Sequence, residues 1–427
     1  MTPRIIIGTT SFRKIRENNF YYVDKTSFLA DFLNGGPDEV TLLTRPRRFG
    51  KSLTMNVLQE FLDIRNASQS DSVNDALFNG LEIMKHPDVC AKWMHQCPVA
   101  FFSLKNMEGK SFEEVMGFLG QQIRFLFTDF DFLADNPTLK PGDGKDFIAL
   151  MKREADPTQL ANSLQILCRA MEAYYGKKAV LLIDEYDVPL NYAKLNGYYP
   201  DMVNFLRKFL GSAFKDNPSL RFAVLTGCLR VAKESIFTGL NNFSCYGISD
   251  ADFADGIGFT SNEVDKLLED FGLSHKKAIF QEWYDGYRFG KCEEIYCPWD
   301  VLQYVKRLKK NPDEVPGMYW NNSSGNDIVK DFLEKFGKDV REKFEALLQN
   351  GSIETSLRET LTYDDLYDSE DNIWTLLYLT GYLTKATQGE MPSSSGKLNL
   401  KIPNKEIHQI YVASVRSWFG KTKSIAR

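Results

Sequence analysis

The sequence predicts an α/β fold built on a parallel sheet, followed by a second, mainly α domain. Continuous apolar runs such as residues 179–183 alternate with segments of helical periodicity, which is typical of parallel strands buried on both faces. The strand-like run 40–44 leads through a basic, glycine-containing loop into a helical pattern. After about Asp255 helical patterns and aromatic-rich links replace the strand-like runs.

The elements follow one another in a regular order. We expect strands at residues 40–44, 99–104, 179–183 and 222–226, and a weaker one at 245–248. Helical periodicity follows Ser52 and recurs at residues 112–127, 160–174 and 204–214. We place the first domain at 1–255, the mainly α domain at 256–400, and a stub or linker at 401–427. Thr260 and Glu263 form a capping box that begins the first helix of the second domain.

Composition limits the classes of protein that the chain can represent. The 427 residues carry 52 basic and 57 acidic side chains, a net charge of −5, which argues against a globally basic nucleic-acid coat. Hydrophobic residues make up 43% and charged residues 26%, as in ordinary globular proteins. The 7 cysteines show no disulfide framework, and neither a signal peptide nor a membrane-length apolar run is present. We therefore expect a cytoplasmic protein with reduced thiols.

The loop after the first strand has the second half of a phosphate-binding P-loop, G-x-x-x-x-G-K-[ST]. Gly50 would let the backbone approach a triphosphate, Lys51 would reach its β- and γ-phosphates, and Ser52 would bind Mg²⁺. Arg45 stands where the motif has its first glycine, which puts the tight turn in doubt, and Pro46 offers another way to stiffen the loop. The alternative is a basic surface loop that merely precedes a helix.

Two adjacent acids end the third strand. In P-loop enzymes the first acid, here Asp184, holds Mg²⁺, and the second, here Glu185, orients and deprotonates the attacking water. A strand that exits into solvent through acidic residues is the alternative, and it is disfavoured by the matching loop upstream. Asp187 is expected to be structural or to act from outside the metal site.

Two further candidates lie at the end of the fourth strand and just after it. Thr226 ends this strand and is a candidate sensor of the γ-phosphate or of the attacking water. Arg230 could act as an arginine finger, although a salt-bridged arginine is the slightly favoured alternative. A possible zinc cluster of His86, Cys90, His95 and Cys97 matches no standard spacing and is not favoured.

The motifs together resemble the AAA-ATPase-like family of bacterial proteins. The matching segments span nearly the whole chain: residues 20–26, 45–52, 182–187, 234–237 with 240–242, 283–287, and 320 with 324–326. The family's own loop has the form Arg-Pro-Arg-Arg-Phe-Gly-Lys-Ser, so the missing first glycine is a family trait. The resemblance implies an additional-strand P-loop fold, with the fourth strand between the first and third.

The resemblance also implies the ligands and the residues that hold them. It implies ATP and Mg²⁺ as cofactors, and it places Asp24 and Lys25 near the nucleotide. Glu185, Lys51, Thr226 and Arg230 are the expected catalytic residues, and Ser52 and Asp184 the expected metal ligands. The expected nucleotide contacts come from the loop and the start of its helix: Arg45, Arg47, Arg48, Phe49, Gly50, Lys51, Ser52 and Leu53.

The expected function is an ATPase whose Mg-dependent hydrolysis drives a conformational switch. A nucleotide-gated regulatory or scaffold module with little turnover is the first alternative. A nucleic-acid-associated protein is another, suggested by the Arg45–Arg48 cluster and the basic terminus. Homo-oligomers and protein partners are left open. Family members typically carry a C-terminal PD-(D/E)xK nuclease-like domain, but only 21 residues follow Glu406, so we expect no nuclease activity.

Overall fold

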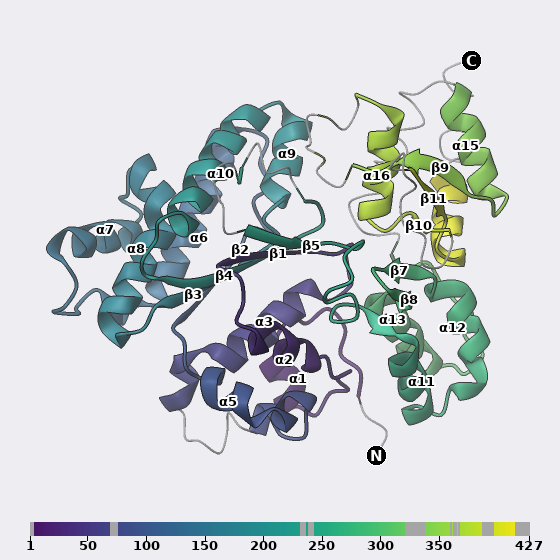
Figure 1. The fold of residues 1–427 in the computed structure, drawn as a ribbon, viewed down its shortest axis with the longest axis horizontal. Coiled ribbons are helices and arrows are strands. Elements are labelled where there is room, and N and C mark those ends of the chain that lie inside the picture. Colours follow the sequence, from purple (N-terminus) through teal and green to yellow (C-terminus); the bar gives the residue numbers. More distant parts are fainter. Residues whose placement is uncertain are drawn as a thin grey trace.

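The first part of the chain is a five-stranded parallel sheet with helices on both faces (Figure 1). This computed structural model describes residues 4–68, 76–230, 236–237, 243–320, 338–358, 361, 365, 368–386 and 397–414. The strands are β1 (Val40–Thr44), β2 (Val99–Ser103), β3 (Ala179–Asp184), β4 (Leu220–Gly227) and β5 (Phe243–Tyr246). Their order is β2-β3-β4-β1-β5, so β4 lies between β1 and β3 as expected.

The strands form where the sequence is continuously apolar. Every residue of β1 and of β3 is buried, because helices cover both faces of the sheet. The first four strands lie close to their predicted positions. The prediction for β5 was two residues too late. Gly247 N–H donates to Asp250 Oδ2 at 2.6 Å instead of continuing the pairing with β1.

The helices of the first part divide between the two faces of the sheet (Figure 1). One face carries α1 (Phe12–Glu17), α2 (Ser27–Asn34), α3 (Lys51–Leu62) and α5 (Pro87–Trp93). The other side carries α6 (Phe112–Thr128), α7 (Pro141–Lys152), α8 (Pro157–Tyr175), α9 (Val188–Asn196) and α10 (Tyr199–Phe214). Short 3₁₀ turns occur at Ile64–Ser68, Glu82–Lys85 and Asp131–Leu133.

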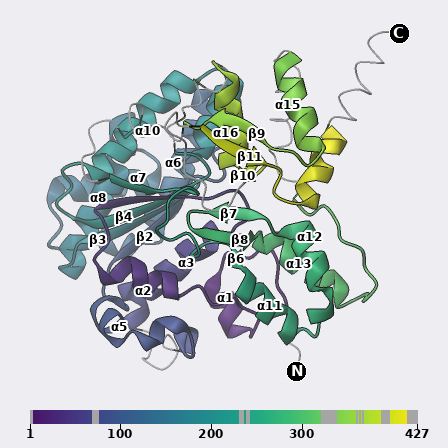
Figure 2. The same ribbon diagram turned by 45° about the vertical axis from the view of Figure 1, so that its right-hand side comes forward.

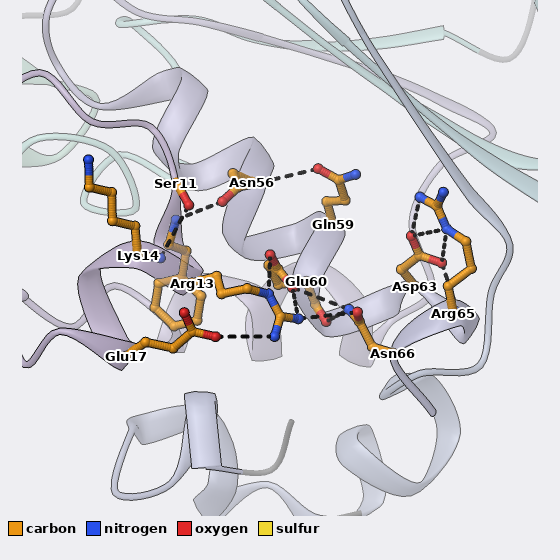
Figure 3. A network of polar contacts seen from close by, with 11 residues as sticks. Ser11, Arg13, Lys14, Glu17, Asn56, Gln59, Glu60, Asp63, Arg65 and Asn66 are labelled. Atoms are coloured by element: carbon orange, nitrogen blue, oxygen red, sulfur yellow. Dashed lines mark hydrogen bonds and ion pairs between the residues drawn. The ribbon is translucent and has the colours of Figure 1, made fainter. Parts of the chain in front are cut away.

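Helix α1 braces α3, the helix that follows the basic loop. Phe12 N–H donates to Asn56 Oδ1 at 2.7 Å. Arg13 Nη2 donates to Glu60 Oε2 at 2.8 Å and to Asn66 Oδ1 at 3.2 Å (Figure 3). These contacts are partly buried, so they fix the position of α3 more firmly than exposed ion pairs would.

The remainder of the chain is mostly helical and packs beside the β5 side of the sheet (Figures 1 and 2). Its helices are α11 (Ser261–Asp270), α12 (Lys277–Tyr284), α13 (Pro298–Leu308), α15 (Lys338–Leu348) and α16 (Glu370–Leu379). The predicted capping box is confirmed, since Thr260 Oγ1 accepts from Glu263 N–H and Glu263 Oε2 accepts from Thr260 N–H.

This C-terminal part also contains two small antiparallel sheets that the sequence did not indicate. Strands β6 (Phe259–Thr260), β8 (Cys292–Tyr296) and β7 (Tyr287–Phe289) form one. Strands β10 (Thr384–Lys385), β11 (Lys397–Lys401) and β9 (Ile353–Ser356) form the other. Residues 405–414 are helical and bury Ile407, Ile410 and Tyr411, so the described start of the expected stub belongs to this core.

Candidate nucleotide-binding site

The basic loop connects the C-terminal end of β1 to the N-terminus of α3. Gly50 has φ 103° and is the N-cap of α3, a conformation that favours glycine. Arg48 has φ 68°, which is costly for a residue with a Cβ. The turn is therefore made at residues 48 and 50. Arg45 has no positive φ, so the missing first glycine does not disturb the loop.

The Arg45 side chain is a buried structural clamp. It is fully buried, and its Nη1 donates to the carbonyl oxygens of Thr44 at 2.8 Å, Tyr246 at 3.1 Å and Gly247 at 2.9 Å. Its Nη2 donates to the Phe253 carbonyl at 2.7 Å. Burial lowers the pKa of the guanidinium to about 10. The guanidinium thus joins β1 to the segment after β5, so only the Arg45 backbone stays a candidate for the predicted nucleotide contact.

Lys51 points back into the loop. Its Nζ donates to the Arg45 carbonyl at 2.8 Å and to the Pro46 carbonyl at 2.9 Å, and it lies 3.7 Å from Cys228 Sγ. The residue is only 7% exposed, yet among the described residues its ammonium group forms no ion pair with a carboxylate. A buried charge without an ionic partner is costly, so this position favours an anionic ligand.

The N-terminus of α3 adds hydrogen-bond donors beside this charge. The first N–H groups of a helix have no partner inside the helix. No described side chain caps the N-terminus of α3. Ser52 and Leu53 lie in this first turn, where backbone N–H groups and the helix dipole together favour an anion.

The ends of β3 and β4 bring two predicted residues into direct contact. Thr226 Oγ1 donates a short hydrogen bond to Asp184 Oδ1, and both side chains are buried. Strand β4 lies between β1 and β3, so these two side chains and the basic loop gather at the same edge of the parallel sheet. Ligands of open α/β sheets bind at this carboxyl edge.

Glu185 follows Asp184 in the chain, and its backbone has a φ of 54°. A glutamate in the left-handed backbone region is uncommon, and such strained residues cluster at functional sites. Burial and then the charge of Asp184 raise the pKa of the Glu185 carboxyl, while the Lys51 and Lys105 ammonium groups oppose this rise. Glu185 therefore lies within electrostatic range of the loop lysine, and Lys105 is a nearby cation that the sequence analysis did not identify.

Tyr186 and Asp187, which follow Glu185, hold the turn after β4 in place. Tyr186 Oη donates to the Leu229 carbonyl at 2.6 Å. Asp187 Oδ2 accepts from the N–H groups of Cys228 at 2.9 Å and Leu229 at 3.0 Å. Burial raises the pKa of Asp187. Asp187 thus has structural contacts, in line with the first of the two roles that the sequence suggested, and these contacts set the position of Cys228 beside Lys51.

The middle of the basic loop faces the C-terminal part. The Arg48 guanidinium lies 4.1 Å from the centroid of the Trp299 ring. Phe49 is buried against Tyr287 and Phe289 of β7, at centroid distances of 4.9 and 5.2 Å. The Arg47 carbonyl accepts from Trp320 Nε1 at 3.4 Å. Among the nucleotide contacts predicted from sequence, the Arg48 and Phe49 side chains therefore have protein partners in this structure.

Asp24 and Lys25 lie at the junction of the two parts. The Asp24 carboxylate accepts from Thr26 N–H at 2.8 Å and from Glu82 N–H at 2.7 Å. Lys25 Nζ donates to Glu263 Oε2 at 2.6 Å and to the Asp255 carbonyl at 2.8 Å. The structure thus gives both side chains structural contacts and does not bring them into contact with Lys51.

The other predictions have separate outcomes. Arg230 is half-buried three residues after the end of β4 and makes no ion pair within the described part of the chain. No group of three or more His, Cys, Asp or Glu side chains in the described ranges is arranged to hold a metal ion, so the candidate zinc ligands do not come together. The family-like segments 234–235, 240–242 and 324–326 and the basic terminus lie outside the described residues.

No helix in the part of the chain that the structure describes has the length and apolarity needed to cross a membrane.

Comparison with known proteins identifies the family to which the first part of the chain belongs. A family model described as Predicted AAA-ATPase matches residues 6–237, more than half of the chain. An uncharacterized protein in the vnfD 5′ region of Azotobacter chroococcum mcd 1 is 27% identical over 411 residues, which cover 95% of this chain and 68% of that protein. The matched range contains β1–β4, the basic loop and the acidic pair at the end of β3. The chain belongs to the AAA-ATPase-like family of predicted AAA-ATPases.

Proposed function

We propose that this protein binds Mg-ATP at the β1–α3 loop and hydrolyses it. The observation that carries the proposal is the buried ammonium of Lys51, which has no carboxylate partner among the described residues and lies at an uncapped helix N-terminus. A triphosphate would supply the missing negative charge, and the free N–H groups of α3 would bind its oxygens. Family membership supports the same ligand.

The residues present also suit Mg²⁺. Ser52 and Asp184 would hold the ion through a hydroxyl and a carboxylate, which are the oxygen ligands that Mg²⁺ prefers. The Asp184 carboxylate is buried, and its Oδ1 is oriented by Thr226. When bound, Mg²⁺ neutralises charge on the phosphates. Thr226 thus acts through Asp184, which gives a physical role to the predicted sensor position.

Glu185 is the candidate base for the attacking water. Burial raises the pKa of its carboxyl, which makes it a stronger proton acceptor than an ordinary exposed carboxylate, and the Lys51 and Lys105 charges oppose this rise. Hydrolysis would change the charge beside a loop whose residues 47–49 contact the C-terminal part. We infer that the conformational switch runs through these contacts.

Two variants test the proposal. Lys51→Ala is expected to abolish the thermal stabilisation that Mg-ATP gives to the wild type, because binding to the folded state stabilises it by mass action. Glu185→Gln is expected to retain that stabilisation and to lose phosphate release by about 10²- to 10⁴-fold, the usual contribution of a general base. Lys85→Ala, at an exposed surface lysine, is the control.

The outcomes separate the candidate functions. Stabilisation of the wild type by Mg-ATP without phosphate release would favour a nucleotide-gated module over an ATPase. Equal stabilisation of wild type and Lys51→Ala would refute the site itself. The nucleic-acid alternative loses one of its supports, because Arg45 of the Arg45–Arg48 cluster is buried and Arg48 covers Trp299.

A further inference from the structure

The C-terminal part holds the outer side of the basic loop by backbone contacts as well as by side-chain packing. Trp320 Nε1 donates to the Arg47 carbonyl at 3.4 Å, and Cys297 Sγ lies 3.7 Å from the Arg48 carbonyl as a donor. The preceding two carbonyls, of Arg45 and Pro46, accept from Lys51. Four successive carbonyls of the loop are therefore occupied by donors from the protein.

The occupied carbonyls determine where the loop's N–H groups point. A trans peptide is planar, and its N–H points opposite to its C=O. The indole of Trp320 therefore turns the N–H of Arg48 away from the C-terminal part, and Cys297 does the same for the N–H of Phe49. A loop that binds phosphate depends on the direction of its backbone N–H groups.

Trp320 is itself fixed by a buried carboxyl group. Its backbone N–H donates to Glu406 Oε1 at 2.7 Å, and its ring packs on Tyr382 with centroids 4.9 Å apart. Trp320 is 2% exposed and Glu406 is 1% exposed. The Trp320 indole is thus held in place by Glu406 and Tyr382, both of which belong to the C-terminal part of the chain.

We propose that Trp320 is a positioning residue for the phosphate-binding loop, through which the C-terminal part controls nucleotide affinity. This proposal rests on the proposed function, since it assigns a control element to the same site. Trp320 does not touch the nucleotide. It acts through the peptide between Arg47 and Arg48, and the strained left-handed conformation of Arg48 is retained because Trp299 and Cys297 hold this residue from the same side.

The experiment compares two tryptophan-to-phenylalanine variants by calorimetric titration with Mg-ATP. Trp320→Phe removes the indole donor and keeps an aromatic ring. Trp93→Phe is the matched control, because Trp93 is 4% exposed and packs on Phe222, and its Nε1 has no partner among the described residues. Trp320→Phe is expected to bind Mg-ATP about three- to tenfold more weakly, as expected for one lost hydrogen bond, while Trp93→Phe binds like the wild type.

A second measurement does not need Trp320→Phe, so the test stands even if that variant does not fold. Coupling between two sites is reciprocal, so Mg-ATP should slow hydrogen exchange in β7 and α13, and Lys51→Ala should show no such change. Normal binding by Trp320→Phe, or wild-type binding without added protection of β7 and α13, would overturn the positioning role alone. Wild type that binds no Mg-ATP would overturn the proposed function as well.

Discussion

At the scale of single residues, Arg45 shows that a motif position can be occupied for a structural reason. Its guanidinium donates to the carbonyls of four residues, and no lysine can reproduce that planar fork. Arg45→Lys should therefore leave buried carbonyls without donors and lower the free energy of unfolding by about 2 kcal/mol or more. Urea denaturation measures this loss. The control Arg169→Lys, in a partly exposed ion pair with Asp143, should change stability little.

The buried carboxyl groups of Asp300 and Glu406 predict an unusual dependence of stability on pH. Burial raises the pKa of both groups, and the proximity of Asp300 raises that of Glu406 further. Between about pH 5 and pH 8 the folded state then keeps protons that unfolded carboxyls, with pKa values near 4, have released. Stability should therefore fall as pH rises, by up to about 1.4 kcal/mol per pH unit for each retained proton.

Glu406→Gln tests this prediction, because the amide oxygen can still accept from Trp320 N–H but the titrating proton is gone. The melting temperature of this variant relative to the wild type should increase from pH 5 to pH 8. Glu354→Gln, at an exposed glutamate paired with Lys397, should show no such trend. A constant difference for Glu406→Gln across this range would contradict the assignment of a retained proton.

Residue identity and order were enough to predict the fold class, and the family resemblance implied the strand order; the contact between Asp184 and Thr226 came from the structure. They were not enough to predict where long side chains end. Arg45 was suggested by its place in the loop and Lys25 by the family resemblance, whereas the structure gives them partners at Tyr246 and Glu263, more than 200 residues away. Trp320 stood out only as part of a family-like segment and Glu406 not at all, because a lone buried tryptophan or glutamate fits many environments.

At the scale of elements, the turn after β4 requires a glycine at position 227, because the side chains of Tyr186 and Asp187 lie where a Cβ would be. A Cβ built on Gly227 would lie 2.6 Å from Tyr186 Cε1 and 2.8 Å from Asp187 Oδ1. Gly227→Ala should therefore displace the contacts that hold Cys228 and lower the free energy of unfolding by about 1–3 kcal/mol. Gly211→Ala is the matched control, since nothing lies within 4 Å of its Cβ and it stands in α10, where alanine is preferred. Chemical denaturation should show the two changes with opposite sign.

The strands of the large parallel sheet could be predicted from the sequence, whereas those of the two small antiparallel sheets could not. Strands β1 to β4 have 5 to 8 residues, most of them apolar, and lie between turn signals. Strands β6, β7 and β10 have only 2 or 3 residues. Such lengths are too short for an alternating pattern, and their pairing depends on packing against partners far along the chain. The C-terminal part was therefore expected to be more uniformly helical than it is.

At the scale of the whole molecule, the main hydrophobic core extends across both parts. Buried residues from Phe12 to Tyr411 belong to this cluster, whereas α11, α12 and α13 pack around a second one. The ion pair between Lys25 and Glu263 joins α11 to the first part. We therefore predict a single calorimetric unfolding transition for the full chain. Two transitions that separate further with salt or pH would instead indicate independent domains, as the boundary near residue 255 would suggest.

The Lys25–Glu263 pair allows a quantitative test of this junction. A double-mutant cycle with Lys25→Met and Glu263→Gln should give a coupling energy of about 1 kcal/mol or more, because both side chains are partly buried and the bond is 2.6 Å long. The exposed pair Lys85–Glu82 provides the control cycle, with an expected coupling well below that value. Equal coupling in the two cycles would show that the junction contributes no more than a surface ion pair.

Strand β5 has a consequence for any attempt to study the matched region as a separate piece. Residues 6–237 end before β5, which in the full chain pairs along β1. In such a fragment the apolar strand β1 would become an open sheet edge with unpaired backbone groups, and Phe49 would lose the two rings of β7 that cover it. Exposed apolar edges recruit other chains by strand addition. Aggregation of that fragment would therefore reflect the missing cover of β1 and would say nothing about the capacity of the loop to bind a nucleotide.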